Sequence, residues 1–217
     1  DDCSSRGLGD VYKRQTPNSG FRYADFIYDS KRERLICVRE DHGGQDSLEF
    51  AASKVSNCLV SLPIGEAIVT DGEVLFSDSD FVSSPTLSAD ASTLAFIWWD
   101  HPNMPWDITT LAVASLTDEG YFSEVTHVQG PCPASILQPR FNGDRQLYVI
   151  SDWSGWWNIY RYDLSRFTDS AEPVNVCPLR AEACSAQWQL GKYNYDFGLD
   201  GSIAVSICSE GHWSLLH

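Results

Sequence analysis

The sequence contains residues that could act as a nucleophile and a general base, but they are not arranged as in a serine hydrolase. The nucleophilic serine of many such enzymes stands in a Gly-x-Ser-x-Gly turn, and no such pentapeptide occurs in the 217 residues. The nearest stretches, Ser154-Gly155 and Gly211-His212-Trp213-Ser214, lack the flanking glycines. We therefore predict no catalytic residue, and we interpret the five histidines as turn or surface residues: His42, His101, His127, His212 and His217.

Seven cysteines are the next candidates for chemistry, because thiols form disulfides and bind metals. Their number is odd, none forms a Cys-x-x-Cys pair, and no histidine stands at ligand spacing beside them. We expect reduced, mostly buried thiols, as in a cytoplasmic protein, and no zinc site. Asp78 and Asp80 supply too few closely spaced oxygen ligands for a calcium loop. The sequence thus predicts no metal and no other cofactor.

Two segments rich in tryptophan and aspartate are the best candidates for a binding function. The first, Trp99–Asp107, contains two prolines that stiffen the chain, and the second contains Trp156 and Trp157. One interpretation is that these segments dock onto another domain or line a substrate cavity. The alternative is packing between neighbouring sheets, with Asp100 and Asp152 as turn residues that accept backbone N–H bonds. The candidate binding residues are Trp99, Asp100, His101, Trp106, Asp107, Trp156 and Trp157.

Composition excludes some classes of partner. The formal net charge is −15, whereas binding to phosphate groups needs clustered lysine and arginine, so no nucleic acid is expected. No run of 18 apolar residues occurs, so no membrane-spanning helix is expected. The simplest interpretation of the negative charge is that it keeps the protein soluble. The functional alternative is an acidic rim that favours the binding of cationic peptides.

Strand signals dominate the sequence and recur in a fixed order. An acidic turn precedes an apolar strand at Asp90, Asp144 and Asp200, which are 54 and 56 residues apart, and more weakly at Asp29. Upstream of these turns stands a recurring short motif, at Ser84–Leu87, Gln138–Phe141 and Ala186–Trp188. A second strand downstream ends in leucine at positions 62, 116, 164 and 216. No window gives a convincing amphipathic helix.

A period near fifty residues, with about four strands in each unit, is typical of a β-propeller. One four-stranded blade cannot bury both of its faces, so blades stack around an axis and cover one another. A β-sandwich could show similar turn spacing, but not this order of motifs. We predict an all-β partial propeller of about four blades, each a four-stranded antiparallel sheet, open rather than closed. Its units are expected at residues 20–77, 78–130, 131–178 and 179–217.

Residues 1–15 show neither alternation nor helical periodicity. Asp10–Gln15 resembles the translated end of a sequencing adapter, so we expect residues 1–15 to be non-native and the propeller domain to comprise 16–217. Because His217 falls inside the expected third strand of the fourth unit, we also expect the propeller to be cut at both ends.

From about Gly20 to Leu216 the sequence resembles the N-terminal, TolB-like propeller of prolyl oligopeptidase family serine peptidases, in the branch of acylaminoacyl peptidases and bacterial dipeptidyl aminopeptidase-like enzymes. Two specific segments carry the resemblance: WDHPNMPWD at Trp99–Asp107 and SDWSGWWNIYRYDL at Ser151–Leu164. Weaker support comes from Arg22–Asp25 and Gly211–Trp213.

The resemblance implies a parent protein in which an α/β-hydrolase domain, carrying a Ser-Asp-His triad, follows the propeller and cleaves short peptides. This chain would then be the inactive propeller, with the hydrolase domain of the same parent chain as its partner and short peptides as the parent's substrates. The alternative function is a stand-alone TolB-like propeller that binds proteins. We expect a cytoplasmic location.

Overall fold

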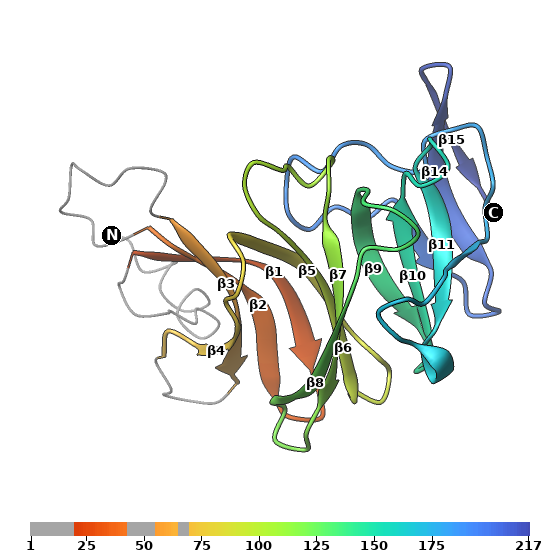
Figure 1. Ribbon diagram of the computed structural model, residues 1–217. Helices are drawn as coiled ribbons and strands as arrows, with labels where there is room; N and C mark the ends of the chain where they lie inside the picture. Colours follow the sequence, from red (N-terminus) through yellow and green to blue (C-terminus); the bar gives the residue numbers. More distant parts are fainter. Residues whose placement is uncertain (1–19, 43–54, 65–69) are drawn as a thin grey trace, which may run out of the picture.

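The computed structural model describes residues 20–42, 55–64 and 70–217, so the segment expected to be non-native lies outside it. The described strands form four antiparallel sheets, placed side by side from the N-terminal to the C-terminal end (Figure 1). The first contains β1 (Phe21–Asp29), β2 (Arg34–Asp41), β3 (Ser56–Pro63) and β4 (Glu73–Phe76). The second contains β5 (Phe81–Leu87), β6 (Thr93–Trp99), β7 (Thr110–Leu116) and β8 (Phe122–Val128).

The third sheet contains β9 (Ile136–Asn142), β10 (Gln146–Ser151), β11 (Asn158–Asp163) and β12 (Val174–Asn175). The fourth has three described strands, β13 (Tyr195–Phe197), β14 (Ile203–Ser209) and β15 (His212–Leu216). Within each sheet the strands lie in sequence order, and the described residues include no α-helix, only the 3-10 turn η2 (Leu164–Arg166). The prediction of an all-β, open partial propeller is confirmed.

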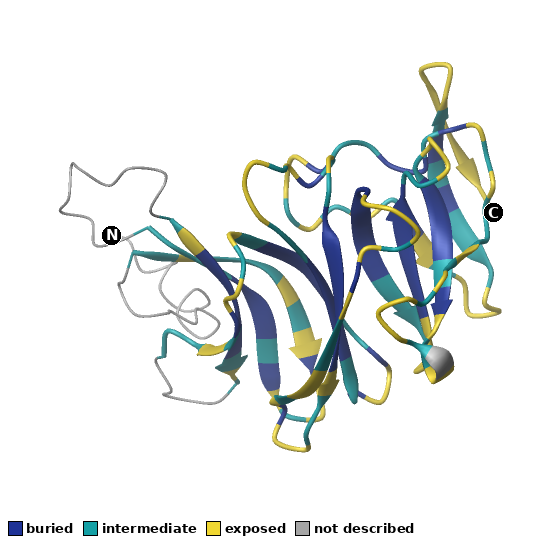
Figure 2. Ribbon diagram, in the orientation of Figure 1, coloured by how far each residue is buried: buried dark blue, intermediate teal, exposed yellow. Residues whose placement is uncertain are grey.

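Strands inside the middle sheets are buried on both faces because another sheet covers each side. Leu94 to Ile97 in β6 and Leu147 to Ile150 in β10 are continuous buried runs (Figure 2). In β14 only Val205 and Ile207 are buried. Their neighbours Ala204, Ser206 and Cys208 are only partly buried, and every residue of β15 is exposed, so the fourth sheet is covered well on one side only.

The first strands of the first three sheets share one backbone irregularity. Asp25, Ser84 and Gln138 all adopt left-handed backbone, with φ of 59°, 55° and 51°. The ladder between each of these strands and its neighbour shifts register near that residue. Residues other than glycine rarely take this conformation, so its recurrence in three consecutive sheets is a structural repeat of the fold.

The position of the fourth copy differs from the sequence prediction. Ala186–Trp188 lies in the connection of residues 176–194, whereas the first strand of the fourth sheet is β13. Ser84 and Gln138 each stand six residues before an acidic turn, at Asp90 and Asp144, and the residue six before Asp200 is Asn194. The fourth copy of the motif was misplaced because Gln187-Trp188 has the polar–bulky pattern of the earlier copies without their distance to the turn.

The recurrent acidic turns hold the hairpins and join neighbouring sheets. Asp90 accepts bonds from the Ser92 N–H at 2.9 Å and the Ser88 hydroxyl at 2.6 Å. The Asp144 carboxylate reaches the previous sheet and accepts the Asp90 N–H at 2.8 Å. Such carboxylates satisfy backbone donors that a tight turn would otherwise leave unpaired.

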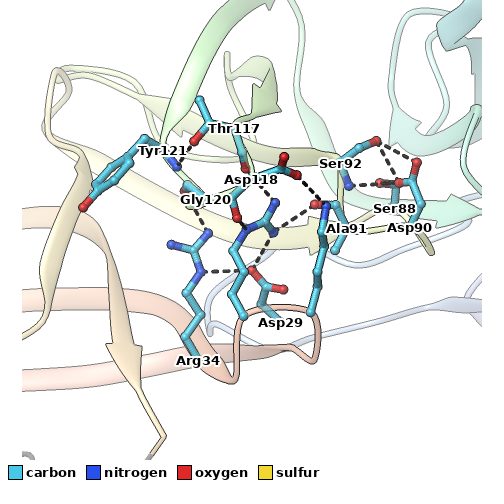
Figure 3. A network of polar contacts seen from close by, with 12 residues as sticks. Asp29, Arg34, Ser88, Asp90, Ala91, Ser92, Thr117, Asp118, Gly120 and Tyr121 are labelled. Carbon is cyan, nitrogen blue, oxygen red and sulfur yellow. Dashed lines mark hydrogen bonds and ion pairs between the residues drawn. The ribbon is translucent and has the colours of Figure 1, made fainter.

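A buried ion-pair network joins the first sheet to the second (Figure 3). Asp29 is fully buried, and one of its carboxylate oxygens lies 2.9 Å from both Arg32 Nη1 and Arg34 Nε. Arg34 also donates to the Gly120 carbonyl at 2.8 Å, and Arg32 donates to the Thr117 carbonyl at 2.8 Å. The weak first copy of the acidic turn is thus the anchor of an inter-sheet contact.

Candidate binding face

The loop between β6 and β7 holds five of the seven predicted site residues at or near its ends, and it is fixed by its own hydrogen bonds. Asp107 accepts the Met104 N–H at 2.9 Å, and its own N–H donates to the Met104 carbonyl at 2.8 Å. The Asn103 N–H donates to the Asp100 carbonyl at 3.0 Å. The Asp107 carboxylate therefore organises its loop.

Asp100 and His101 tie the same loop to the residue before β5. Asp100 accepts the Asp80 N–H at 2.7 Å, and Asp80 in return accepts the His101 N–H and contacts His101 Nδ1, both at 2.9 Å. These bonds, led by the one from the His101 N–H, lower the pKa of the Asp80 carboxyl. His101 is exposed, and its hydrogen bonds to Asp80 hold the loop against the residue that precedes β5.

The loop between β10 and β11 repeats part of this arrangement. Asp152 accepts the N–H of Ser135, which lies directly before β9, at 3.0 Å. Burial raises the pKa of Asp152, although this hydrogen bond opposes the effect. Trp157 packs against the core, and its backbone N–H donates to the Glu182 carboxylate at 2.9 Å, whereas Trp156 is exposed. Asp152, which we weighed as a turn residue, therefore acts as one.

Trp99 and Trp106 come together at an apolar hollow of about 200 Å³. The Trp99 ring stacks on Phe81 with centroids 5.3 Å apart, and the Trp106 ring lies 4.2 Å from that of Trp188. Trp188 is 72% exposed and belongs to the connection before β13, which reaches back toward the β6–β7 loop (Figure 1). The hollow is lined by Phe81, Ser83, Trp99, Met104, Pro105, Trp106, Gln187, Trp188, Gln189 and Leu190.

The seven predicted site residues therefore lie in two separate places. Trp99 and Trp106 line the hollow, and Asp100, His101 and Asp107 hold the loop that carries Trp106. Trp156 and Trp157 belong to the next sheet and do not line the hollow. Sequence reasoning missed Trp188 as a site residue because it was counted as part of the repeated motif before the acidic turn, whereas the structure exposes its ring, and an exposed tryptophan is a signal of a binding surface.

Metals and disulfides have no visible role in the described part of the chain. All six cysteines within it are free, namely Cys37, Cys58, Cys132, Cys177, Cys184 and Cys208. No group of three or more histidine, cysteine or acidic side chains there is placed to hold a metal ion. Among the same residues, no helix has the length and apolar character needed to cross a membrane.

Among the solved structures with the same fold are peptidases that are much longer than this chain. A puromycin-hydrolysing peptidase from Mycobacterium tuberculosis shares 34% identity over 90% of this chain and 29% of its own length, with a TM-score of 0.78. A puromycin hydrolase in complex with PGG shares 29% identity over 92% of this chain and 30% of its own, also with a TM-score of 0.78. The resemblance to the propeller portion of prolyl oligopeptidase family peptidases is confirmed.

The fold extends to a more distant member of this group. Prolyl oligopeptidase B from Galerina marginata covers 87% of this chain with 12% identity and a TM-score of 0.61, which establishes the fold alone. The chain spans less than a third of each of these three peptidases. No protein-family model and no curated protein matches the sequence.

Proposed function

We propose that this chain is the non-catalytic propeller of a serine peptidase that cleaves short peptides, and that its β6–β7 loop face lies against the hydrolase domain and lines the substrate cavity. The similarity to two puromycin-hydrolysing enzymes supports the peptidase assignment. The observation that carries the cavity assignment is the pair of Trp106 and Trp188 at an apolar hollow, with Trp106 on a loop that internal hydrogen bonds hold in place.

The chemistry of this face favours apolar contact over charge recognition. The Asp100 and Asp107 carboxylates already accept backbone N–H bonds, so they hold the loop and have less capacity for a substrate amine. The exposed apolar surface is offered by Trp188 and by Met104, which is 43% exposed. Aromatic and methionine side chains of this kind are enriched in binding surfaces, where they supply most of the apolar area.

A cytoplasmic location is part of this proposal. The six described cysteines are all free, as expected in a compartment that keeps thiols reduced. Counting free thiols in denatured, unreduced protein from the native host would test the location, because an oxidising compartment would leave several of them paired.

The proposal is tested first by the DNA that follows the codon of His217. A reading frame that continues into a hydrolase domain with a Gly-x-Ser-x-Gly turn agrees with the peptidase assignment. A stop codon directly after the remaining blades would contradict it and favour the alternative, a stand-alone TolB-like propeller that binds proteins.

The cavity assignment is tested in the complete peptidase. Replacing Trp106 by alanine should lower kcat/KM for short peptide amides about five- to tenfold, the effect of losing roughly 1–1.5 kcal/mol of aromatic contact. The matched control is Tyr121→Ala, which removes an exposed aromatic ring from the β7–β8 turn. Equal effects of the two substitutions would contradict a substrate-lining role for Trp106.

A further inference from the structure

The hollow at the β6–β7 loop combines an aromatic wall with a polar side chain. Trp106 and Trp188 form the wall, with ring centroids 4.2 Å apart, and Gln187 lines the hollow beside the buried Ser83. Its volume of about 200 Å³ is below the roughly 300–1,000 Å³ of pockets that hold drug-sized ligands. The hollow therefore suits a single amino-acid side chain better than a larger molecule.

The Gln187 side chain has an acceptor without a donor. Gln187 is 6% exposed, and its Oε1 atom is buried and makes no hydrogen bond within the described part of the chain. The other end of the amide, Nε2, donates to Ser84 Oγ at 3.3 Å, which is longer than an ordinary N–H···O bond, so the amide can turn toward a better partner. A buried acceptor without a donor destabilises the protein, so a ligand that brings an N–H group into the hollow would be favoured.

The sheet that carries most of the hollow is strongly acidic. Residues 78–128 contain no lysine or arginine and eight acidic residues, namely Asp78, Asp80, Asp90, Asp100, Asp107, Asp118, Glu119 and Glu124. Asp100 and Asp107 belong to the β6–β7 loop itself, and Asp80 is bonded to it. On the connection before β13, Lys192 is the only basic residue between positions 181 and 194. This excess of negative charge favours a cationic ligand over an anionic one.

The aromatic wall decides which cation fits. Asp100 and Asp107 each use a carboxylate oxygen for a backbone N–H, so the loop offers few acceptors to a strongly hydrated ammonium group. A guanidinium group is more weakly hydrated, lies flat on aromatic rings and carries five N–H donors, one of which Gln187 Oε1 can accept. Ring surfaces, an unpaired acceptor and negative charge together match the side chain of arginine.

We propose that the hollow binds the side chain of an arginine in a peptide, with the guanidinium against the rings of Trp106 and Trp188 and one of its N–H groups bonded to Gln187 Oε1. The methylene groups of the arginine then lie on the apolar lining, which includes the half-exposed Met104. The consequence for peptide cleavage, a preference for substrates that contain arginine, rests on the proposed function. The binding itself is a property of this chain.

The first test asks whether the chain by itself prefers arginine. The chain is labelled with 5-fluorotryptophan, and the fluorine NMR signals of Trp106 and Trp188 are assigned by replacing each residue with phenylalanine. The probes are three N-acetylated tripeptide amides, Gly-Arg-Gly, Gly-Lys-Gly and Gly-citrulline-Gly. Citrulline has nearly the shape of arginine without its charge. The titrations are run at about 0.15 M salt, which screens attraction between exposed charges.

The arginine peptide should shift the signals of Trp106 and Trp188 and bind about five- to tenfold more tightly than the citrulline peptide. It should also bind roughly threefold or more tightly than the lysine peptide, whose ammonium group is more strongly hydrated. Equal affinity for arginine and citrulline would show that the hollow holds only apolar groups. Equal affinity for arginine and lysine, or shifts confined to other tryptophans, would show general attraction to an acidic chain. Each of these results would overturn the proposal.

Substitutions test the two contacts separately. Trp188→Ala removes an exposed ring, and Gln187→Leu removes the acceptor, so each should weaken binding of the arginine peptide about three- to fivefold. The control is Trp213→Ala, which removes an exposed tryptophan from the fourth sheet and should leave the affinity unchanged. A cooperative thermal melt checks the folding of each variant. Because Trp188 is mostly exposed, its substitution tests the site even if Gln187→Leu fails to fold.

A further measurement in the complete peptidase separates this site from the proposed function. There Trp188→Ala should raise KM several-fold more for an arginine-containing substrate than for its citrulline counterpart. If the chain by itself prefers arginine but the complete peptidase shows no such difference, the arginine site stands and the assignment of the hollow to the substrate cavity fails. If the chain by itself shows no preference, the site is refuted whatever the complete peptidase cleaves.

Discussion

Asp100 and Asp152 perform the same structural task in consecutive sheets. Each follows the second strand of its sheet and accepts the backbone N–H of a residue that directly precedes the first strand: Asp80 for Asp100, and Ser135 for Asp152. Each aspartate thus fixes the loop after one strand against the entry of another. The two residues are the structural counterpart of the sequence repeat.

Although the two aspartates have the same role, their substitution by alanine should lower the free energy of unfolding by different amounts. Ser135 is fully buried, so Asp152→Ala leaves a buried N–H without an acceptor and should lower the free energy of unfolding by about 1–3 kcal/mol. Asp80 is exposed, and water can replace the acceptor lost in Asp100→Ala, which should therefore cost clearly less. Urea unfolding of the two variants measures both values, and a larger loss for Asp100→Ala would contradict this account.

Much of this fold could be predicted because the sequence repeats one pattern, an acidic turn followed by an apolar strand. Acidic turns 54 and 56 residues apart gave the blade period, and the apolar runs after them became β6, β10 and β14. The exception was Ala186–Trp188, where a local pattern outweighed the distance to the turn. Local resemblance is weaker evidence than spacing, because spacing reflects the whole blade.

The candidate site could be predicted only in part. Trp99 and Trp106 stood in an unusual loop whose composition drew attention to them. The contact between Trp106 and Trp188 joins residues 82 positions apart, and no local pattern indicates it. The network around Asp29 was equally hidden, since its acceptors include backbone carbonyls of Thr117 and Gly120, which carry no sequence signal.

The Asp29 network predicts a large, specific stability effect. Asp29→Ala would leave the buried guanidinium groups of Arg32 and Arg34 without their counterion, at a cost of about 3–5 kcal/mol. The control is Asp118→Ala, which removes an exposed partner of Lys31 and should cost at most about 1 kcal/mol. Chemical unfolding at pH 7 distinguishes the two, and similar losses would contradict a dominant role for the buried pair.

The same network predicts a pH dependence. Burial by itself raises the pKa of Asp29, but the hydrogen bonds and charges of Arg32 and Arg34 outweigh it and lower that pKa below the ordinary value of 3.8. A lowered pKa in the folded state means that the contribution is complete above about pH 4 and is lost as the pH falls through the folded value. The difference in Tm between wild type and Asp29→Ala should therefore be constant from pH 5 to 7 and shrink below pH 4.

Thiol reactivity should differ sharply among the free cysteines. Burial raises the pKa of Cys37 to about 12, with a smaller effect from neighbouring Cys58, whereas Cys132 is exposed. The thiolate is the reactive form, so among the described cysteines iodoacetamide at pH 8 should label Cys132 first and Cys37 only after unfolding. Peptide mapping by mass spectrometry over time gives the order, and early labelling of Cys37 would show that the first sheet opens readily.

The chain should show no serine hydrolase activity of its own. It contains no Gly-x-Ser-x-Gly turn, so fluorophosphonate probes should not label it, and aminoacyl and acyl-aminoacyl chromogenic substrates should remain intact. Intact-mass spectrometry after probe treatment checks this directly. Stoichiometric labelling of one serine would refute it.

The last prediction concerns the uncovered faces of the end sheets. In β15, Trp213 and Leu215 are 53% and 74% exposed, and two residues apart on a strand they share one face of the fourth sheet. In β1, Phe26 and Tyr28 are 51% and 56% exposed in the same manner. Within the described residues β15 pairs only with β14, so it also presents a free edge. Apolar patches and free edges of this kind promote association, and the purified chain should self-associate.

Size-exclusion chromatography with light scattering should show species above 24.2 kDa, and the double substitution Trp213→Ser with Leu215→Ser should shift the population toward monomer. Leu199→Ser is the matched control, because Leu199 is fully exposed in the β13–β14 turn and lies outside both strands. A monodisperse wild-type monomer would contradict the prediction, and an equal effect of Leu199→Ser would show that general surface hydrophobicity, not the face of the fourth sheet, drives association.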